Sequence, residues 1–379
     1  MRKTQTALNI FQTILKLIFT ARKRTQWSLS IFCVLTGASL IALPFGAIQS
    51  AISFLIPNSW TDEPLTVSLL NSDTSIVSQT SAIVAGFILI GFGMYIGAVA
   101  VKINSRKRIL PIEHLGLPNL ERRGFIKNLP KEYASMNRDE VVLIDGRDTS
   151  PEEQLNRIQY KMADLREKIA KGGDPNDYIP IYGGLAQVPM VACAGFLWGN
   201  KTPIHVRDYD RQKDVWHDND EPDDDAQLEL QSIPAVNLAD KEFGVCLEFS
   251  IKMDRHAMAR DFPSLPLFFV HYSDGLAGYD KISSADKQAR FAHQISQYLN
   301  DLIRAHRKVD RVHLFVTAQN SFVFRLGQQL NQLHMPTFQI HYYDARVDPP
   351  GHPWSIKVSQ KNDDGPKVIH NNMVRPETA

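Results

Sequence analysis

The chain has 379 residues, more than one typical domain, and its 42 Lys and Arg residues balance 41 Asp and Glu residues. This balance excludes a global basic field, so we expect no DNA partner and any anion-binding site to be local. The three cysteines lie far apart without a C-x-x-C pair, which fits a reducing compartment and argues against a structural zinc site.

Residues 1–27 are expected to form a cytosolic amphipathic segment. Six apolar residues share one face of it, and a basic cluster at 22–24 follows, so this face would rest on the inner leaflet of a membrane. The six residues are Leu8, Phe11, Ile14, Leu15, Ile18 and Phe19.

Two long runs without charge follow, at 25–61 and 74–101. Each exceeds the roughly 20 apolar residues that cross the hydrocarbon core of a membrane, and the first is too long for a cleaved signal peptide. We therefore predict two transmembrane helices within 28–103. They should span about Ser28 to Ile56 and Ile83 to Ile103, joined by a short outer loop at 57–81.

The charges beside these spans predict their orientation. Lys and Arg cluster at 22–24 and 106–108, whereas 57–81 holds acidic residues and no Lys or Arg. By the positive-inside rule, both termini and the domain after the spans are cytoplasmic. Because no Asp, Glu, Lys, Arg or His lies inside the two charge-free runs, an ion channel or proton relay is not expected.

Gly93 and Gly97 have the GxxxG spacing at which helix backbones can approach closely. Two interpretations of this packing pair stay open. The glycines either pack the two spans of one hairpin together or form contacts between protomers.

After a linker at 104–137, residues 138–379 are predicted to form an α/β domain in which the same order of elements occurs twice. The lobes should cover about 138–250 and 251–360. In the first lobe we predict strands at 141–145, 179–182 and 204–206, a helix capped by Ser150 and a helix at 188–198. In the second we predict strands at 267–271, 312–316 and 338–342, a helix containing Phe291 and a helix at 322–333.

The two halves align residue by residue. Ile204-His205-x-x-Asp208 matches Ile340-His341-x-x-Asp344, and Gly195 matches Gly327. Strands that alternate with amphipathic helices predict two Rossmann-like lobes with parallel sheets, related by a pseudo-two-fold axis. Because ligands of such sheets bind beyond the carboxyl ends of the strands, we expect both lobes to share one cleft.

Two features that suggest a metal have simpler interpretations. The acidic segment 214–225 has the composition of a solvated loop. His205 and His341 are expected to be strand residues with ordinary hydrogen bonds. We therefore predict no metal site.

The stretch "VHLFVTAQNSFVFRLGQQLN", followed by "FQIHYYDARVDPP", resembles the C-terminal signature of SAVED domains, whose lobes are CARF-like. The resemblance extends over about Asp139 to Pro350. Together with the two spans, the chain resembles the transmembrane SAVED effectors of bacterial CBASS anti-phage systems (2TM-SAVED).

This resemblance implies a sensor of a cyclic oligonucleotide second messenger, a cyclic trinucleotide containing adenine, with no other cofactor. It also implies self-association into higher oligomers or filaments, contact with lipids of the bacterial inner membrane, membrane disruption and abortive infection. It further implies which loops contact the ligand. These loops contribute Thr317, Gln319, Asn320 and Ser321, their first-lobe counterparts Gly183 and Gln187, and Ser273, Asp274 and Gly275.

Arg147, in the loop 146–150 after the first predicted strand, and Lys281 are candidates for phosphate contacts, and Tyr182 and Tyr279 for base stacking. A purely structural role in a turn or on the surface stays open for each residue.

Two other classes of function remain. An enzyme is not predicted, because the sequence has no G-x-S-x-G, H-E-x-x-H or Walker motif and no supported carboxylate pair. The alternative to an effector is a membrane-tethered nucleotide-sensing receptor or scaffold that signals to another protein without damaging the membrane.

Overall fold

The computed structural model describes residues 25–42, 76–118 and 124–371, the last range with short gaps. These gaps are 128, 131–132, 134–135, 173, 211–212, 232–240, 280, 307–308, 331–334, 348 and 361–364. The chain divides into two compact units, Met1–Arg106 and Lys107–Ala379.

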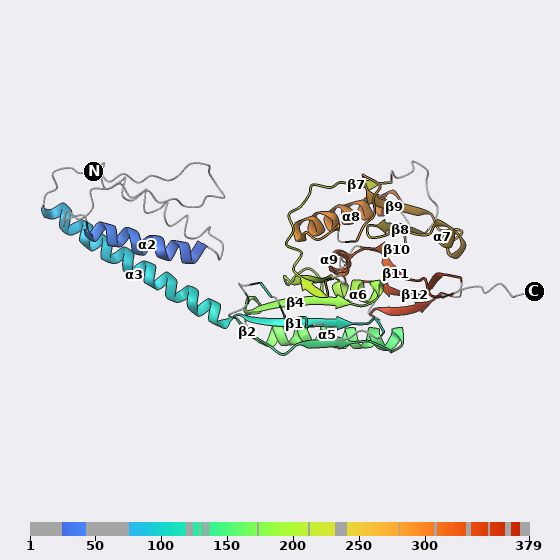
Figure 1. Ribbon diagram of the computed structural model, residues 1–379, viewed down its shortest axis with the longest axis horizontal. Helices are drawn as coiled ribbons and strands as arrows, with labels where there is room; N and C mark the ends of the chain where they lie inside the picture. The colour runs from blue at the N-terminus through green and yellow to red at the C-terminus, as the bar shows by residue number, and fades with distance from the viewer. Residues whose placement is uncertain are drawn as a thin grey trace, which may run out of the picture. The chain divides into compact units, whose positions relative to one another are not determined.

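Helices α2 (Thr25–Ala42) and α3 (Ile76–Arg106) pack against each other in the first unit (Figure 1). A Cβ on Gly93 would lie 2.8 Å from the Ser30 carbonyl oxygen, and one on Gly97 would lie 3.0 Å from the Ser30 hydroxyl. This hydroxyl donates to the Gly93 carbonyl at 2.7 Å. Gly93 and Gly97 therefore pack the two helices of one hairpin together, which is the first of the two interpretations.

Among the described helices, only Ile83–Lys102 is long and apolar enough to be a candidate membrane span. Helix α2 ends at Ala42, and the rest of the predicted first span lies outside the described residues. Most of segment 1–27 and of loop 57–81 also lies outside them. The two-span arrangement and its orientation therefore stay predictions.

The second unit contains two mixed sheets (Figure 1). The first sheet is built from β1 (Arg108–Leu115), β2 (Asn137–Arg138), β3 (Val142–Asp145), β4 (Tyr178–Leu185), β5 (His205–Asp210) and β6 (Val215–His217). The second sheet is built from β7 (Leu228–Leu230), β8 (Glu242–Glu248), β9 (Leu267–Tyr272), β10 (Arg311–Thr317), β11 (Thr337–Asp344), β12 (Gly351–Val358) and β13 (Lys367–His370). The main helices are α5 (Pro151–Lys171), α6 (Val188–Trp198), α7 (Arg255–Asp261), α8 (Ala285–Ala305) and α9 (Asn320–Leu330).

The predicted internal repeat is present in the structure. Helices α5 and α8 each have 21 residues, and α6 and α9 each have 11. Each long helix leads into a strand, β4 or β10, and each short helix leads into the next strand, β5 or β11. Ser150 caps α5 as predicted, since its hydroxyl accepts from the Glu153 amide at 3.2 Å.

The structure corrects three boundary and topology predictions. The expected linker 104–137 contains β1, which pairs with β2, β3 and β4. The second sheet begins at β7, so the boundary between the lobes lies before 228 and not at 250. The sheets are mixed, not purely parallel, because β5–β6, β7–β9, β11–β12 and β12–β13 pair antiparallel.

Pro111 explains why the sequence predicts a linker where β1 lies. Proline has no amide hydrogen for a ladder and is rare inside central strands. On one edge β1 pairs with β2 at 108–109 and with β3 at 112–115, so Pro111 falls between the two ladders.

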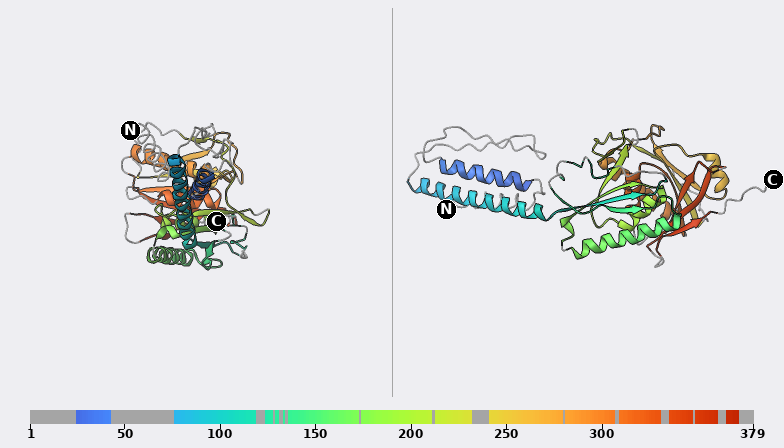
Figure 2. Two further views of the ribbon diagram at one scale, coloured as in Figure 1. Left: turned by 90° about the vertical axis from the view of Figure 1, so that its left-hand side faces the viewer. Right: turned by 60° about the horizontal axis from the view of Figure 1, so that its bottom comes forward.

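Helices α6 and α9 lie between the two sheets and join the lobes (Figures 1 and 2). A Cβ on Gly195 would lie 2.0 Å from the Phe324 carbonyl oxygen, and one on Gly327 would lie 2.1 Å from that of Ala192. The two contacts are equivalent, because each carbonyl belongs to the residue three positions before the other glycine. The matched glycines of the repeat thus let the two helices cross in backbone contact.

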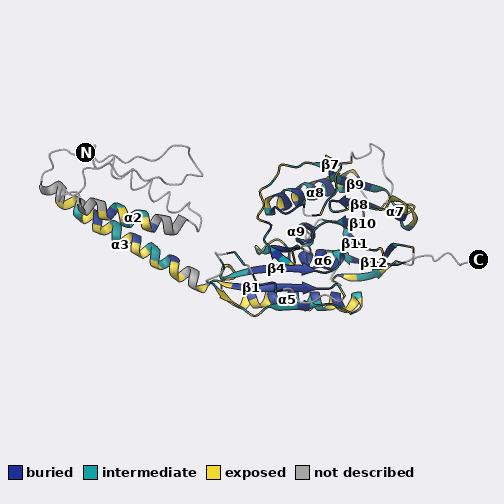
Figure 3. Cartoon of the chain, in the orientation of Figure 1, coloured by how far each residue is buried: buried dark blue, intermediate teal, exposed yellow. Residues whose placement is uncertain are grey.

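One hydrophobic core runs through both lobes. It includes Leu110, Tyr182 and Val206 of the first sheet and Leu314 and Ile340 of the second. Strands β1 and β4 are buried almost throughout (Figure 3). The other face of the first sheet has a separate cluster of residues.

Arg207 fixes this separate cluster. Its guanidinium is fully buried and lies 2.7 Å from a carboxylate oxygen of Asp218. It also donates to the carbonyl oxygens of Phe125, at 2.6 Å, and Trp216, at 3.0 Å. One side chain therefore holds two segments over the sheet.

The acidic segment makes defined ion pairs within the second unit. Asp223 accepts two hydrogen bonds from Arg290, at 2.9 and 2.7 Å, and Asp224 pairs with Lys287 at 2.7 Å. This segment therefore holds the N-terminal half of α8. Among the described residues, no group of three potential metal ligands was found.

Candidate functional site

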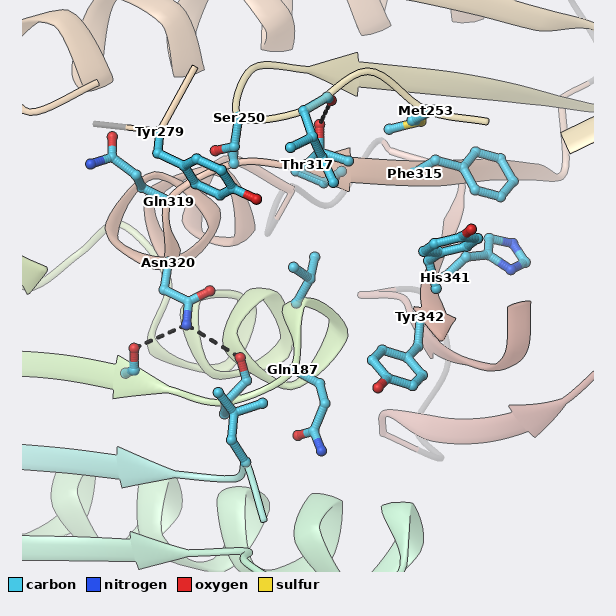
Figure 4. Close-up of a pocket in the computed structure, with 18 of the residues that line it drawn as sticks. Gln187, Ser250, Met253, Tyr279, Phe315, Thr317, Gln319, Asn320, His341 and Tyr342 are labelled. Carbon is cyan, nitrogen blue, oxygen red and sulfur yellow. Dashed lines mark hydrogen bonds between the residues drawn. The ribbon is translucent and has the colours of Figure 1, made fainter. Parts of the chain in front are cut away.

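A cavity of about 730 Å³ lies at the carboxyl ends of strands from both sheets, within the second unit. The first lobe contributes Leu117, Gly184–Val188 and Asp208–Asp210. The second lobe contributes Ser250–Asp254, Met258, Tyr279, Phe315–Asn320, His341–Tyr343 and His352 (Figure 4). The cleft shared by two lobes is thus where the sequence placed it, and its size is that of a site for a sizeable ligand.

The two short helices begin at this cavity but differ in how their first turns are satisfied. At α9, the buried carboxylate of Asp208 accepts from the amide of Ser321, at 3.2 Å, and from its hydroxyl. The matching residue of the repeat, Asp344, instead pairs with Arg346 at 2.9 Å. Helix α6 has no side-chain cap, so the positive end of its dipole faces the cavity without a capping carboxylate.

Asn320 connects the lobes at the floor of the cavity. Its amide nitrogen donates to the carbonyl oxygens of Gly184, at 3.0 Å, and Ala186, at 3.2 Å (Figure 4). Because these bonds fix the amide orientation, the side-chain oxygen points away from these two carbonyls.

Four tyrosines line the cavity, and two of them offer exposed rings. Tyr279 is 74% exposed and Tyr343 is 39% exposed. Tyr342 stacks on Trp354 with ring centroids 4.8 Å apart, and burial raises the pKa of its phenol. Tyr209 lies against Trp216. Exposed aromatic rings and a helix N-terminus that line one cavity suit a ligand with both bases and phosphates.

Three buried histidines form one wall near the cavity. His313 and His341 have ring nitrogens 2.8 Å apart, and His341 stacks on Phe315. His352 hydrogen-bonds to Asp261 at 2.9 Å. Burial lowers the pKa of all three, most strongly for His341, where the neighbouring histidines add to the effect.

The histidine wall should make stability depend on pH. A histidine with a native pKa below its unfolded value of 6.5 stays neutral in the fold, while the unfolded chain takes up a proton as the pH falls. The contribution of these histidines to the free energy of unfolding should therefore be at its maximum above about pH 6.5 and decrease as the pH falls below that value. Each unit of pKa depression corresponds to about 1.4 kcal/mol.

Urea unfolding of the full chain at about pH 7.5 and at about pH 5 measures this effect. The substitution that tests it is His341→Gln. The variant should lose less stability between the two pH values than the wild-type chain. His256→Gln, at an exposed histidine of α7, should keep the wild-type difference. An unchanged difference in His341→Gln would contradict the assignment.

The structure brings together five of the residues predicted for the site. Gln187, Tyr279, Thr317, Gln319 and Asn320 line the cavity. Ser321 lies just behind them, where it is buried and bonded to Asp208 and Gln288.

Other predicted residues lie elsewhere. Tyr182 cannot stack on a base in this structure, because it is fully buried, stacked on Phe324 and hydrogen-bonded to His114. Gly183 faces the separate cluster on the other face of the first sheet, since a Cβ on it would lie 2.5 Å from Phe125. Arg147 binds its neighbour Asp145 and does not line the cavity.

The loop after β9 also does not line the cavity through Ser273, Asp274, Gly275 or Lys281. Lys281 pairs with Asp274 at 3.2 Å and donates to the Leu276 carbonyl at 2.7 Å. These contacts hold the loop together, which is the structural alternative that the sequence left open.

Sequence reasoning missed the loop Ser250–Asp254, because the preceding strand β8 was not recognised. The signal was the apolar run from Phe243 to Phe249, which is interrupted by Gly244 and Glu248. Tyr342 and Tyr343 belong to the aromatic stretch that carried the resemblance, yet they were not assigned to the site.

Comparisons with known proteins give a family. The model of the SAVED family, described as the SMODS-associated and fused to various effectors sensor domain, matches residues 161–358. No curated protein is similar enough in sequence to count as a match.

Similar solved structures include the Acinetobacter baumannii Cap4 SAVED/CARF-domain containing receptor with the cyclic trinucleotide 3'3'3'-cAAA. It is 14% identical, with 72% of this chain and 58% of that chain covered, at a TM-score of 0.42. The same receptor with the cyclic trinucleotide 2'3'3'-cAAA is also 14% identical, with the same coverage of both chains, at a TM-score of 0.43. The Moraxella osloensis Cap4 SAVED/CARF-domain containing receptor is 12% identical, with 72% of this chain and 56% of that chain covered, at a TM-score of 0.40. The chain thus spans just over half the length of these receptors.

Proposed function

Because the chain belongs to the SAVED family of sensor domains, we propose that it senses a cyclic oligonucleotide, which it binds in the cavity shared by its two lobes. The observation that carries this proposal is the cavity itself. It combines the uncapped N-terminus of α6 with the exposed rings of Tyr279 and Tyr343, and these groups suit phosphates and bases. The ligand is proposed to be a cyclic trinucleotide containing adenine, and the domain to act as a sensor without enzymatic activity.

The output is proposed to occur at a membrane. The hairpin of α2 and α3, with the candidate span Ile83–Lys102, supports an anchor in the bacterial inner membrane. The basic residues at 106–108 support a cytoplasmic sensor domain. Ligand binding would drive self-association and membrane disruption, which leads to abortive infection in a CBASS system.

Binding is tested with the full chain in detergent and a panel of cyclic di- and trinucleotides, by isothermal titration calorimetry. Tyr279→Ala should weaken the best ligand about tenfold or more, because base stacking contributes about 1–3 kcal/mol. Tyr160→Ala removes a tyrosine that is 69% exposed on α5 and does not line the cavity, so it should bind like wild type. Equal loss in both variants would contradict the assignment of the cavity.

The membrane step is tested by dye release from vesicles that contain the full chain. Release that depends on the ligand found by calorimetry supports the effector. Binding without release would favour a receptor or scaffold that leaves the membrane intact.

A further inference from the structure

The two side-chain cations predicted for phosphate contact, Arg147 and Lys281, are already paired with carboxylates. Arg147 makes two bonds to the carboxylate of Asp145, at 2.9 and 2.7 Å, and Lys281 is held by Asp274. Neither residue lines the cavity. A site for an anionic ligand therefore needs a different side-chain cation.

Lys252 is the only Lys or Arg among the described residues that line the cavity. Its side chain is exposed, and it makes no ion pair within the part of the chain that the structure describes. It is therefore the one side-chain cation at this site whose charge is not already matched by a neighbouring carboxylate.

The three aspartates that line the same cavity have donors of their own. Asp208 binds the first turn of α9, and Asp210 pairs with Lys213 at 3.1 Å. Asp254 caps α7, since it accepts from the amides of His256 and Ala257. These local contacts offset the acidic charge and leave Lys252 available to a ligand.

The loop that carries Lys252 is fixed on both sides of it. The hydroxyl of Thr317 donates to the Ile251 carbonyl at 2.6 Å. The Met253 amide donates to the carboxylate of Glu248, which is 3% exposed, at 2.9 Å. Thr317 thus holds the backbone just before the lysine and Glu248 holds it just after. A backbone fixed in this way loses little freedom when a ligand binds.

We infer that Lys252 binds a phosphate group of the ligand, and that Thr317 and Glu248 are positioning residues that hold its loop. This inference rests on the proposed function, which supplies the class of ligand. An ammonium is a compact point charge with three donors, so it binds a phosphodiester without demanding one orientation. The second lobe then contributes the charge and the first lobe contributes the uncapped helix end.

The test uses the full chain in detergent, with 3′–5′ linked cyclic tri-adenylate as the first probe and the rest of the panel after it. Affinity is measured by calorimetry at several salt concentrations between about 50 and 200 mM. Lys252→Gln should weaken binding about 10- to 100-fold and lower the salt slope of log affinity by about one. Lys252→Arg keeps the charge and should restore both.

Two further variants separate this role from a general loss of charge or structure. Lys171→Gln, on an exposed residue of α5, should change neither affinity nor salt slope. Thr317→Val loosens the loop but leaves the ammonium, so it should weaken binding while the salt slope stays that of wild type.

The possible failures can be distinguished. A wild-type chain that binds a ligand of the panel, while Lys252→Gln binds it with equal affinity and slope, overturns the inference alone. A loss in Lys281→Gln in place of Lys252→Gln does the same. A wild-type chain that binds no cyclic oligonucleotide overturns the proposed function and the inference with it.

Discussion

Replacing Gly195 or Gly327 with alanine should destabilise the second unit by about 3 kcal/mol, the upper part of the usual range for overpacking. Each new Cβ would lie 2.0 or 2.1 Å from a backbone carbonyl oxygen of the opposite helix. A backbone cannot rotate out of the way as a side chain can, so α6 and α9 would have to move apart. Urea unfolding of the full chain, followed by tryptophan fluorescence, measures the change.

Gly91→Ala is the matched control for these variants. Gly91 also lies inside a helix, α3, but a Cβ there meets nothing within 4 Å. Alanine is favoured over glycine in a helix by about 1 kcal/mol, so this variant should be neutral or more stable. Gly195→Ala and Gly327→Ala with wild-type stability would contradict the close crossing of α6 and α9.

Arg207→Met should cost about 3–5 kcal/mol, because it leaves the partly buried carboxylate of Asp218 without its charged partner. The carbonyl oxygens of Phe125 and Trp216 lose their donor in the same step. Methionine fills a similar length, so the effect reports the lost bonds more than a lost volume. The same unfolding experiment measures the change in the free energy of unfolding.

Arg304→Met controls for the loss of an arginine. Its side chain is 82% exposed and lies 3.8 Å from Asp301, an arrangement that contributes little to stability. A change within about 0.5 kcal/mol is expected. Equal effects of the two substitutions would contradict a stabilising role for the buried contacts of Arg207.

The repeat could be predicted from the sequence because its signals are local. Helical spacing, the cap at Ser150 and the register of Gly195 with Gly327 each depend on a few neighbouring residues, and the structure confirms them. What the sequence could not provide was the reason for the match. Each glycine is needed by a helix more than a hundred residues away, and no local pattern records such a contact.

The same strand was missed in both halves of the repeat. Strands β1 and β8 are equivalent, since each pairs in parallel with the strand before the long helix of its lobe, β3 or β9, and with the strand after it, β4 or β10. Both carry residues that weaken a strand pattern, Pro111 in one and Gly244 in the other. Tertiary pairing outweighs these local preferences, so the linker and the lobe boundary were misplaced.

Site residues were predicted with less success than elements. The sequence located the loops after β4 and β10, but it could not tell a cation that faces the cavity from one bound to a nearby carboxylate. Arg147 and Asp145 are two residues apart, and their pairing depends on a turn that the sequence did not specify. Tyr182 shows the same limit, because its burial follows from the packing of α9 in the other lobe.

The order of the chain has a consequence for its synthesis. Helices α2 and α3 are complete once residue 106 is made, whereas the cavity needs residues from Leu117 to His352. At a synthesis rate of roughly 5–20 residues per second, His352, the last residue that lines the cavity, is added about 12–50 s after residue 106. A nascent chain therefore has the hairpin of α2 and α3 long before it has the cavity, and under the proposed function only a completed chain could bind the ligand.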